Sequence, residues 1–285
     1  STISAISVGF LSYIARAFGA KDKEVAKCAA AQAVLVVVIV GALVTIITLS
    51  LSGMIPIWMQ VDESIQAMAS QYFFIIYMPM LFRTASIIFG TLLRAAGDTK
   101  TPMKIGVLVN LTNVVLNFLL IYQIRELSIL GITFIMPGAG LGVIGAAIAS
   151  AIAFTVGGIC ITIVLWRHPL VSPRGKSFRP DMKILKPCLT VAFPNMLQRF
   201  GTSLGYVFFA SMINSIGEVA TAAHTIANTV ESAFYIPGYG MQTAAATLAG
   251  NAYGANDKKR MDDLGAMFIP IEIVLMIFSG GGLFV

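Results

Sequence analysis

Long stretches without formal charge dominate the sequence, and they constrain the fold more than any other feature. The stretch from Val219 to Asn256 contains a single charged residue, Glu231. A membrane-crossing helix needs about 20 apolar residues, so this stretch is long enough to cross a bilayer. Over the whole chain 57% of residues are hydrophobic and 11% are charged, whereas about 25% are charged in soluble domains. The sequence therefore predicts an all-α, polytopic membrane protein.

Basic residues are concentrated in alternate loops. Four clusters, at 16–27, 94–104, 167–186 and 258–260, hold most of the 19 lysines and arginines. The loops between them contain a single basic residue, Arg125. Because basic loops stay on the cytoplasmic side, this pattern predicts the orientation of every helix and a place in the cell (cytoplasmic) membrane. The positive charge therefore does not indicate a nucleic-acid partner.

The apolar runs predict about eight membrane segments, and we expect the chain to be incomplete at both ends. Residues 123–137 are predicted only as a poorly defined external connection, part of which dips into the interface. The three cysteines show no metal-ligand spacing and no disulfide framework. Predicted helices cover about 1–17, 25–51, 64–93, 103–122, 140–166, 182–216, 218–260 (including the charged turn that closes it) and 260–285.

The helix that begins at Glu218 carries a polar stripe. His224, Asn228, Glu231 and Tyr235 are spaced i, i+4, i+7 and i+11, which places them on one helical face. Lipid cannot satisfy such groups, so they must face protein or a wet cavity. Pro237 and the glycines after it are predicted to interrupt this helix, as in transporter binding sites. The alternative is a packing seam with a simple kink.

A short repeat divides the chain. The sequence AFGAKDK at 17–23 matches AYGANDK at 252–258, and both follow an inward-running helix rich in small residues. Because both copies lie at the cytoplasmic end of their helices, the repeat predicts a parallel duplication, as between the halves of some transporters. We therefore predict an N-terminal lobe at 1–166, a cytoplasmic linker at 167–181 and the start of a C-terminal lobe at 182–285.

Three segments, beginning LLRAAGDTKTP, GAGLGVIGAAIASAIA and AAHTIANTVESAFYIPGYG, resemble the multidrug and toxic compound extrusion (MATE) family. The likeness covers nearly the whole chain. It implies a two-lobe bundle of twelve helices that exports organic, often cationic, compounds in exchange for Na⁺ or H⁺. On that mapping the chain runs from the family's second helix into its ninth. The first helix, which carries a coupling carboxylate in many members, is outside this sequence.

Several side chains are candidates for substrate or ion binding. Glu231 is the foremost, because a carboxylate in a low-dielectric helix pairs, binds a cation or takes up a proton. Its alternative is a permanent ion pair with Arg199 or Arg83. For His224 we expect a structural hydrogen bond, and for the two arginines a stabilising role. The candidates are Glu231, Asn228, Gln198, Thr202, Asn110, Asn113, Asn117 and Tyr235.

The amide candidates also fit a purely structural role. Asn110, Asn113 and Asn117 are spaced i, i+3 and i+7, so they line a cavity or bind helices together with equal plausibility. Gln198 and Thr202, at i and i+4, leave the same choice open. Where members of the family carry an acidic residue after the proline of the seventh helix, this sequence has no carboxylate, which leaves the coupling ion undecided.

The sequence favours a monomeric secondary antiporter for small amphipathic or cationic compounds, with Na⁺ or H⁺ as coupling ion and no cofactor or metal. We find no Walker loop, zinc spacing or nucleophile–base pair, so we predict that it is not an enzyme. One alternative is a lipid-linked glycan flippase of the same superfamily, which predicts a more basic cavity. Another is a non-transporting membrane scaffold or receptor, in which polar stripes point apart and are paired in isolation.

Overall fold

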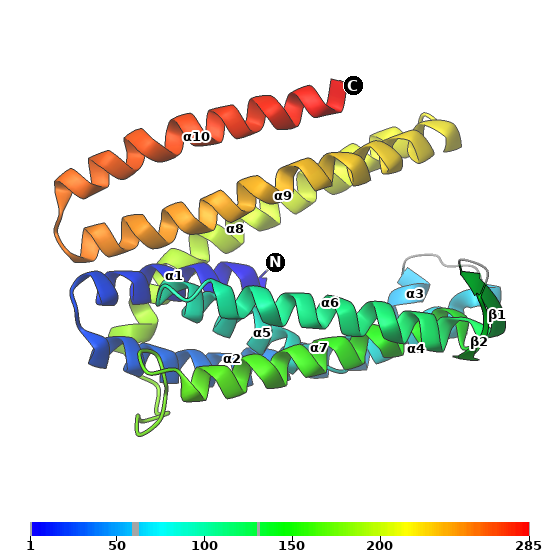
Figure 1. Ribbon diagram of the computed structural model, residues 1–285, viewed down its shortest axis with the longest axis horizontal. Coiled ribbons are helices and arrows are strands. Elements are labelled where there is room, and N and C mark those ends of the chain that lie inside the picture. Colours follow the sequence, from blue (N-terminus) through cyan, green and yellow to red (C-terminus); the bar gives the residue numbers. More distant parts are fainter. Residues whose placement is uncertain (1, 59–62, 130–131, 285) are drawn as a thin grey trace. The chain divides into compact units, whose positions relative to one another are not determined.

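The computed structural model describes residues 2–58, 63–129 and 132–284, and it is helical over most of its length (Figure 1). The helices are α1 (Thr2–Gly19), α2 (Lys23–Leu51), α3 (Ile55–Trp58), α4 (Glu63–Tyr77), α5 (Met80–Ala95), α6 (Lys100–Ile121), α7 (Gly142–Arg167), α8 (Met182–Asn214), α9 (Glu218–Gly254) and α10 (Lys258–Phe284). A hairpin of β1 (Gln123–Ile129) and β2 (Ile132–Ala139) lies between α6 and α7.

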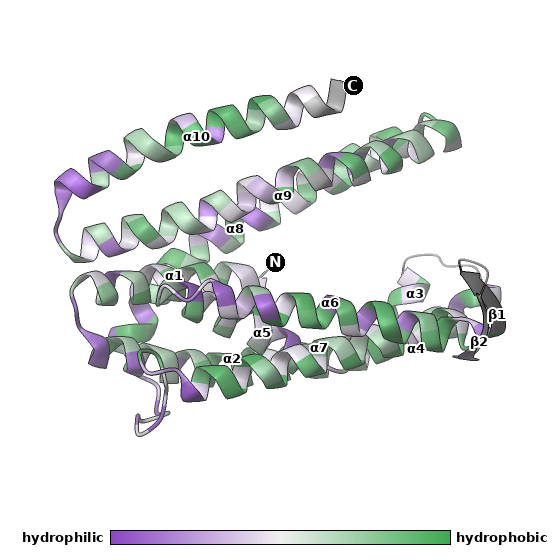
Figure 2. Cartoon of the chain, viewed as in Figure 1, coloured by the Kyte–Doolittle hydropathy of each residue, from purple (hydrophilic) through white to green (hydrophobic). Residues whose placement is uncertain are grey.

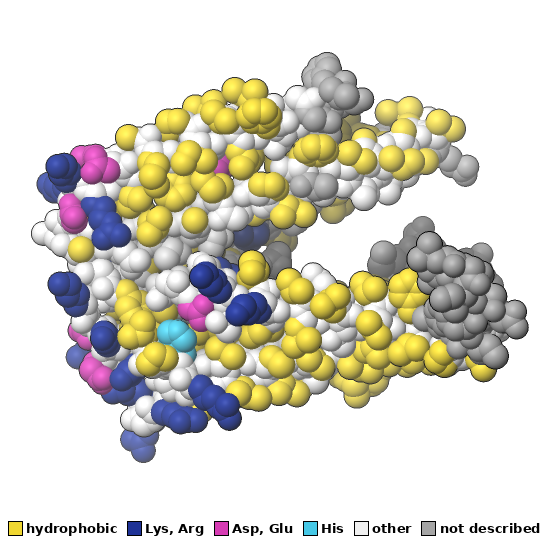
Figure 3. All heavy atoms as spheres, viewed as in Figure 1, with side chains coloured by type: hydrophobic (Ala, Val, Ile, Leu, Met, Phe, Trp, Pro, Cys, Tyr) yellow, Lys and Arg dark blue, Asp and Glu magenta, His cyan; other side chains and the backbone are white. Residues whose placement is uncertain are grey.

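The helices confirm a polytopic membrane fold. Among the described residues, five helices are long and apolar enough to cross a membrane, and the number is six if the bent pair α4–α5 counts as one span. α8 and α9 do not meet the same hydropathy criterion, and including them gives the predicted count of about eight. Apolar residues run along the helices, whereas polar residues gather in the turns (Figure 2). Within each part of the chain, charged side chains gather at one end of the helices (Figure 3).

Two predicted helix shapes are wrong. The helix predicted at 64–93 is two helices, α4 and α5, bent by 43° where Pro79 lies between them. α9, in contrast, continues through Pro237, where an interruption was predicted. A proline removes one N–H donor and displaces one carbonyl. In a helix of 37 residues the hydrogen-bonded turns on both sides maintain the helix through that single defect.

The connection after α6 is more regular than predicted. β1 and β2 pair antiparallel, from Gln123 opposite Ala139 to Ile129 opposite Ile132, with an irregularity near Gln123. The ladder continues beyond the strands, because the Gly140 amide donates to the Tyr122 carbonyl at 2.8 Å. Isoleucine, threonine and phenylalanine in residues 129–135 were the available strand signal. This signal is short beside the apolar helices on either side, so the sequence predicted only a poorly defined external connection here.

The chain folds as two compact units. Unit 1 comprises 1–29, 95–97 and 181–285, and unit 2 comprises 30–94 and 98–180. These units describe compactness, whereas the predicted lobes (1–166 and 182–285, with a linker at 167–181) describe a duplicated topology. The lobe boundaries therefore stay a prediction.

In unit 1, the two repeated turns have the same backbone structure. The Asp22 carboxylate accepts from the Val25 amide and the Asp257 carboxylate accepts from the Arg260 amide, each at 3.0 Å. The residue before each aspartate is left-handed, with φ of 59° at Lys21 and 57° at Asn256. Glycine, asparagine or a turn constraint is usual at such positions. The seven-residue sequence match therefore corresponds to a matched structure.

These turns are packed against each other through glycines at the ends of α1 and α9. A Cβ atom on Gly19 would collide with the carbonyl of Asn251, and a Cβ atom on Gly254 would collide with the carbonyl of Arg16. The two contacts are reciprocal, since Gly19 and Gly254 occupy the same position of the repeat, as do Arg16 and Asn251. Only glycine lets two helix backbones approach so closely.

Unit 2 is held together by small residues of α7. Gly158 lies against the backbone of Phe82 in α5, where a Cβ atom would come 2.6 Å from the Phe82 carbonyl oxygen. Gly145 lies against the Leu120 carbonyl at the end of α6. α7 therefore contacts α5 and α6 at backbone distance, as expected for membrane helices without a hydrophobic driving force between them.

The turn between α5 and α6 is joined to the end of α7 in unit 2. The Asp98 carboxylate accepts from the Thr101 amide at 3.0 Å, and its other oxygen lies 3.9 Å from Nε2 of His168. Burial lowers the pKa of His168 below its ordinary value of 6.5, and the attraction of Asp98 offsets this only in part. Burial would raise the pKa of Asp98, but the Thr101 bonds and His168 hold it below its ordinary value.

This histidine makes stability depend on pH. Because the folded-state pKa of His168 is lowered, the unfolded chain binds more protons as the pH falls below 6.5. The contribution of neutral His168 to stability is therefore fully present above pH 6.5. It is lost as the pH falls from there through the folded-state pKa of His168. We expect the His168→Asn variant, followed by thermal unfolding in detergent at stepped pH, to lose less stability than the wild type between neutral and mildly acidic pH. Equal pH slopes for the two proteins would contradict this role.

Candidate functional site

The polar stripe of α9 lies in unit 1. Glu231 and Tyr235 are exposed, and Asn228 and His224 are half-buried. The His224 ring packs 5.4 Å from the ring of Phe209 and 6.5 Å from that of Tyr206, both in α8. Its Nε2 atom is buried without a hydrogen-bond partner among the described residues. The expected structural hydrogen bond of His224 is therefore not formed, and aromatic packing holds the ring.

Glu231 is not in an ion pair within the part of the chain that the structure describes. The ion pair there joins Lys27 to Glu24, and His168 pairs with Asp98 only when its ring is protonated. In unit 1 the alternative partner Arg199 is exposed on α8. In unit 2 the Arg83 guanidinium lies 4.9 Å from the centre of the Phe154 ring. Glu231 is thus an exposed carboxylate on a mostly apolar helix, with no ion-pair partner among the described residues.

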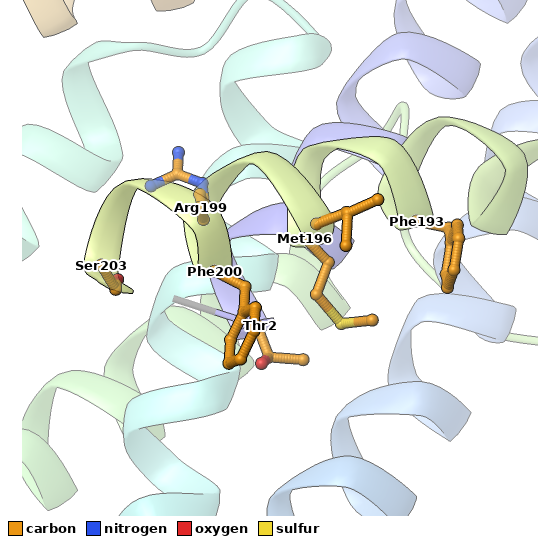
Figure 4. A pocket seen from close by; sticks show the side chains of 7 residues that line it. Thr2, Phe193, Met196, Arg199, Phe200 and Ser203 are labelled. Carbon is orange, nitrogen blue, oxygen red and sulfur yellow. The ribbon is translucent and has the colours of Figure 1, made fainter. Parts of the chain in front are cut away.

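A pocket of about 320 Å³ lies between α8 and the start of α1, lined by Thr2, Phe193, Met196, Leu197, Arg199, Phe200 and Ser203. In Figure 4 the Met196 and Phe200 side chains point toward Thr2, whereas the Arg199 guanidinium points away from them. Gln198 and Thr202 do not line this pocket. The Thr202 hydroxyl donates to the Gln198 carbonyl within the same helix at 3.0 Å. The pocket is therefore an apolar surface beside the two polar candidates.

The asparagines of α6 separate into two groups in unit 2. The Asn113 amide donates to the Ser150 hydroxyl of α7 at 3.1 Å, and the Asn117 amide donates to Oδ1 of Asn113 at 3.0 Å. Oδ1 of Asn117 is buried and has no hydrogen-bond partner among the described residues. Asn110 is exposed and lines a pocket between α5, α6 and α7. Asn113 therefore links α6 to α7, and Asn117 bonds Asn113 within α6 while its own oxygen has no partner among the described residues.

The structure adds two residues that the sequence interpretation did not select. Ser150 is not among the sequence candidates, yet its hydroxyl accepts the Asn113 amide. Arg94 was counted in a basic loop, yet its Nε atom is buried without a hydrogen-bond partner among the described residues. The available signal for Ser150 was a hydroxyl among alanines on an apolar helix. For Arg94 the signal was its place one residue before the end of α5.

Similar proteins are found over nearly the whole chain. A sequence model of the MatE family matches residues 2–119 and 194–280. The probable multidrug resistance protein NorM of Thermotoga maritima is 29% identical over 257 residues, which cover 90% of this chain and 53% of that protein. The probable multidrug resistance protein YoeA of Bacillus subtilis is 26% identical over 292 residues, 98% of this chain and 58% of that protein.

Solved structures agree with the sequence match. The crystal structure of MATE in complex with MaD3S superposes with a TM-score of 0.84 at 25% identity, covering 97% of this chain and 60% of that one. The structure of MATE in the bent conformation gives a TM-score of 0.82 at 25% identity and covers 59% of that chain. The present chain thus spans little more than half the length of the relatives it matches. The family match, the relatives and the superposed structures together place the chain in the multidrug and toxic compound extrusion (MATE) family.

Proposed function

We propose that the protein containing this chain is a secondary antiporter that exports small amphipathic or cationic organic compounds in exchange for Na⁺ or H⁺. Membership of the MATE family supports this proposal, as do the names of the relatives, which are probable multidrug resistance proteins. We further propose that it acts as a monomer in the cell membrane, catalyses no reaction and uses no cofactor beyond the coupling ion.

The observation that carries the proposal is the buried, unpartnered Oδ1 atom of Asn117. A buried acceptor without a partner costs about 1–3 kcal/mol. Polar groups within membrane helices often mark ion and substrate paths. Oxygen atoms are the ligands of hard cations, and the side-chain oxygens of Asn113 and Ser150 are bonded in the same cluster. The cluster therefore suits a bound cation, or a proton donor such as a hydronium ion.

Glu231 provides the second part of the proposal. It is the sole formal charge between Val219 and Asn256 and has no ion-pair partner among the described residues. A carboxylate in this setting exchanges its proton or cation as its surroundings change from water to protein. Asn228 and Tyr235 are on the same helical face and are proposed to contact the organic substrate or the ion beside it, with Gln198 and Thr202 contributing from α8.

The proposal is tested on the full-length protein in liposomes loaded with a fluorescent organic cation. Sodium and proton gradients are imposed separately, and the wild type is compared with Glu231→Gln. We expect gradient-driven efflux from the wild type and at least a tenfold loss in the variant, because glutamine keeps the size of the side chain and removes its charge. Thr229→Val, a neighbouring change at a hydroxyl that bonds only within its own helix, is the control.

The outcomes separate the parts of the proposal. Efflux that survives Glu231→Gln under both gradients would remove Glu231 from the coupling site while leaving the antiporter in place. Folded wild-type protein without efflux under either gradient would contradict the antiporter itself.

A further inference from the structure

We propose that a pocket between α5, α6 and α7 of unit 2 binds a phosphate group, with the Arg94 guanidinium as its principal ligand. The group is the headgroup phosphate of an anionic phospholipid or free inorganic phosphate. The pocket, called here the Arg94 pocket, has a volume of about 370 Å³. It is separate from the Asn117 cluster, and the inference does not depend on the proposed antiport.

Arg94 is a half-buried cation whose hydrogen-bond donors are only partly satisfied. One of its terminal nitrogens donates to the Thr91 hydroxyl at 3.0 Å, which fixes the guanidinium against α5. Its Nε atom is buried without a hydrogen-bond partner, and no carboxylate pairs with Arg94 among the described residues. A buried charge is strongly unfavourable unless an opposite charge and hydrogen bonds compensate for it. The geometry therefore leaves the Arg94 guanidinium with charge and hydrogen-bond donors that can bind an anion.

The carboxylate nearest in sequence is already engaged elsewhere. Asp98 accepts from the Thr101 amide with one oxygen and lies beside His168 with the other. Lys100 and Lys104, exposed on the first turns of α6, add positive charge to this end of the unit. The lining of the Arg94 pocket itself includes two arginines, Arg83 and Arg94, and no carboxylate, so it is positive. Arginine is the residue best suited to phosphate, because its planar fork of donors matches the phosphate oxygens.

Two glycines leave room beside the guanidinium. A Cβ atom on Gly90 would lie 3.8 Å from the nearest Arg94 nitrogen, so glycine leaves an open wall there. Gly106, across the pocket on α6, has no atom within 4 Å of its Cβ position. Gly106 and Asn110 are exposed, so the pocket reaches the surface of the unit along α6. A phosphate has access without displacing a packed side chain.

The position and lining of the pocket favour a lipid as the source of the phosphate. Arg94 lies in the last turn of α5, at the end of a span, which is the level of lipid headgroups. Ile87, Ile105 and Val109 form an apolar wall further along the helices, where an acyl chain would lie. Basic pockets between membrane helices on the cytoplasmic side are known to hold anionic headgroups.

The experiment measures lipid retention by the purified full-length protein. Native mass spectrometry compares phosphatidylglycerol with phosphatidylcholine of the same acyl chains, with and without added inorganic phosphate. The variants are Arg94→Gln, Arg94→Lys and the matched control Arg167→Gln, which removes an exposed charge from the last turn of α7. Thermal unfolding verifies that each variant is folded, and Arg94→Lys retains the charge should Arg94→Gln fail to fold.

We expect Arg94→Gln to weaken phosphatidylglycerol binding about tenfold, the effect of losing a charged hydrogen-bond donor. Arg94→Lys should lie between that variant and the wild type, and Arg167→Gln should bind as the wild type does. Arg94-dependent competition by inorganic phosphate, without preference for phosphatidylglycerol, would support the site and assign it to free phosphate. Equal losses in Arg94→Gln and Arg167→Gln, or no loss in any variant, would overturn the proposal.

Discussion

Replacing Gly254 with alanine is expected to destabilise the protein by about 1–3 kcal/mol, the cost of inserting an atom into a closely packed contact. The added Cβ atom would collide with the carbonyl of Arg16, and its distance to the Arg16 Cα would be only 2.8 Å. Backbone atoms cannot move aside as a flexible side chain does, so α1 and α9 must separate. Gly19→Ala should have a comparable effect, because its Cβ atom would meet the Asn251 carbonyl in the reciprocal contact.

A glycine of the same helix provides the control for this prediction. Gly240 lies in α9 and has no atom within 4 Å of its Cβ position. Gly240→Ala should therefore be neutral or stabilise the helix by about 0.5–1 kcal/mol, the propensity difference between the two residues. Thermal unfolding of the purified variants in detergent gives the comparison. If Gly254→Ala and Gly240→Ala unfold at the same temperature as the wild type, the close approach of α1 and α9 does not stabilise the protein.

Replacing Asn117 with leucine is expected to reduce gradient-driven efflux at least tenfold while changing stability by less than about 1 kcal/mol. The substitution removes a buried acceptor without a partner, which is a gain, and leaves Oδ1 of Asn113 without its donor, which is a loss. These two effects oppose each other. Transport should fall, because the unpartnered oxygen is the atom proposed to hold the coupling ion. A loss of transport without a loss of stability is the result expected for a residue that is retained for function.

The control for Asn117→Leu is Thr155→Val in α7. The Thr155 hydroxyl donates to the Ala151 carbonyl of its own helix at 2.8 Å, so valine removes a polar group without affecting the link between α6 and α7. Efflux by Thr155→Val should match that of the wild type. A loss of stability in Asn117→Leu as large as its loss of transport would assign Asn117 to structure alone. The apparent affinity for sodium, measured with the gradient varied, then separates ion binding from substrate binding.

Much of the helical architecture follows from the sequence. Long uncharged runs predict helices because, in lipid, a helix satisfies every backbone group within its own segment. The turns AFGAKDK and AYGANDK could also be matched in advance, since each combines a glycine, a left-handed residue and a capping aspartate within seven positions. These features are determined by residues that lie close together in the sequence, so each can be predicted from a single segment.

The hairpin and the two prolines show where local signals fail. Pro79 lies at a break between two helices, whereas Pro237 is contained within a continuous helix. Each proline removes the same hydrogen bond, so the difference comes from the length and packing of the flanking turns, which one position cannot reveal. The hairpin at 123–139 has a real strand signal, but it was short beside the apolar helices on either side.

The sequence by itself determined which segments are membrane helices, how the basic loops alternate and which polar residues are exceptional on apolar faces. The tertiary structure alone decided which of those polar residues meet. Asn113 bonds Ser150, 37 positions away, and the Asn117 oxygen in the same cluster finds no hydrogen-bond partner among the described residues. Asp98 is engaged by His168, which leaves Arg94 without a carboxylate among the described residues. The physical reason is that the hydrogen-bond and ion-pair partners of these side chains come from other helices. Only the packing of those helices decides which partners are within reach.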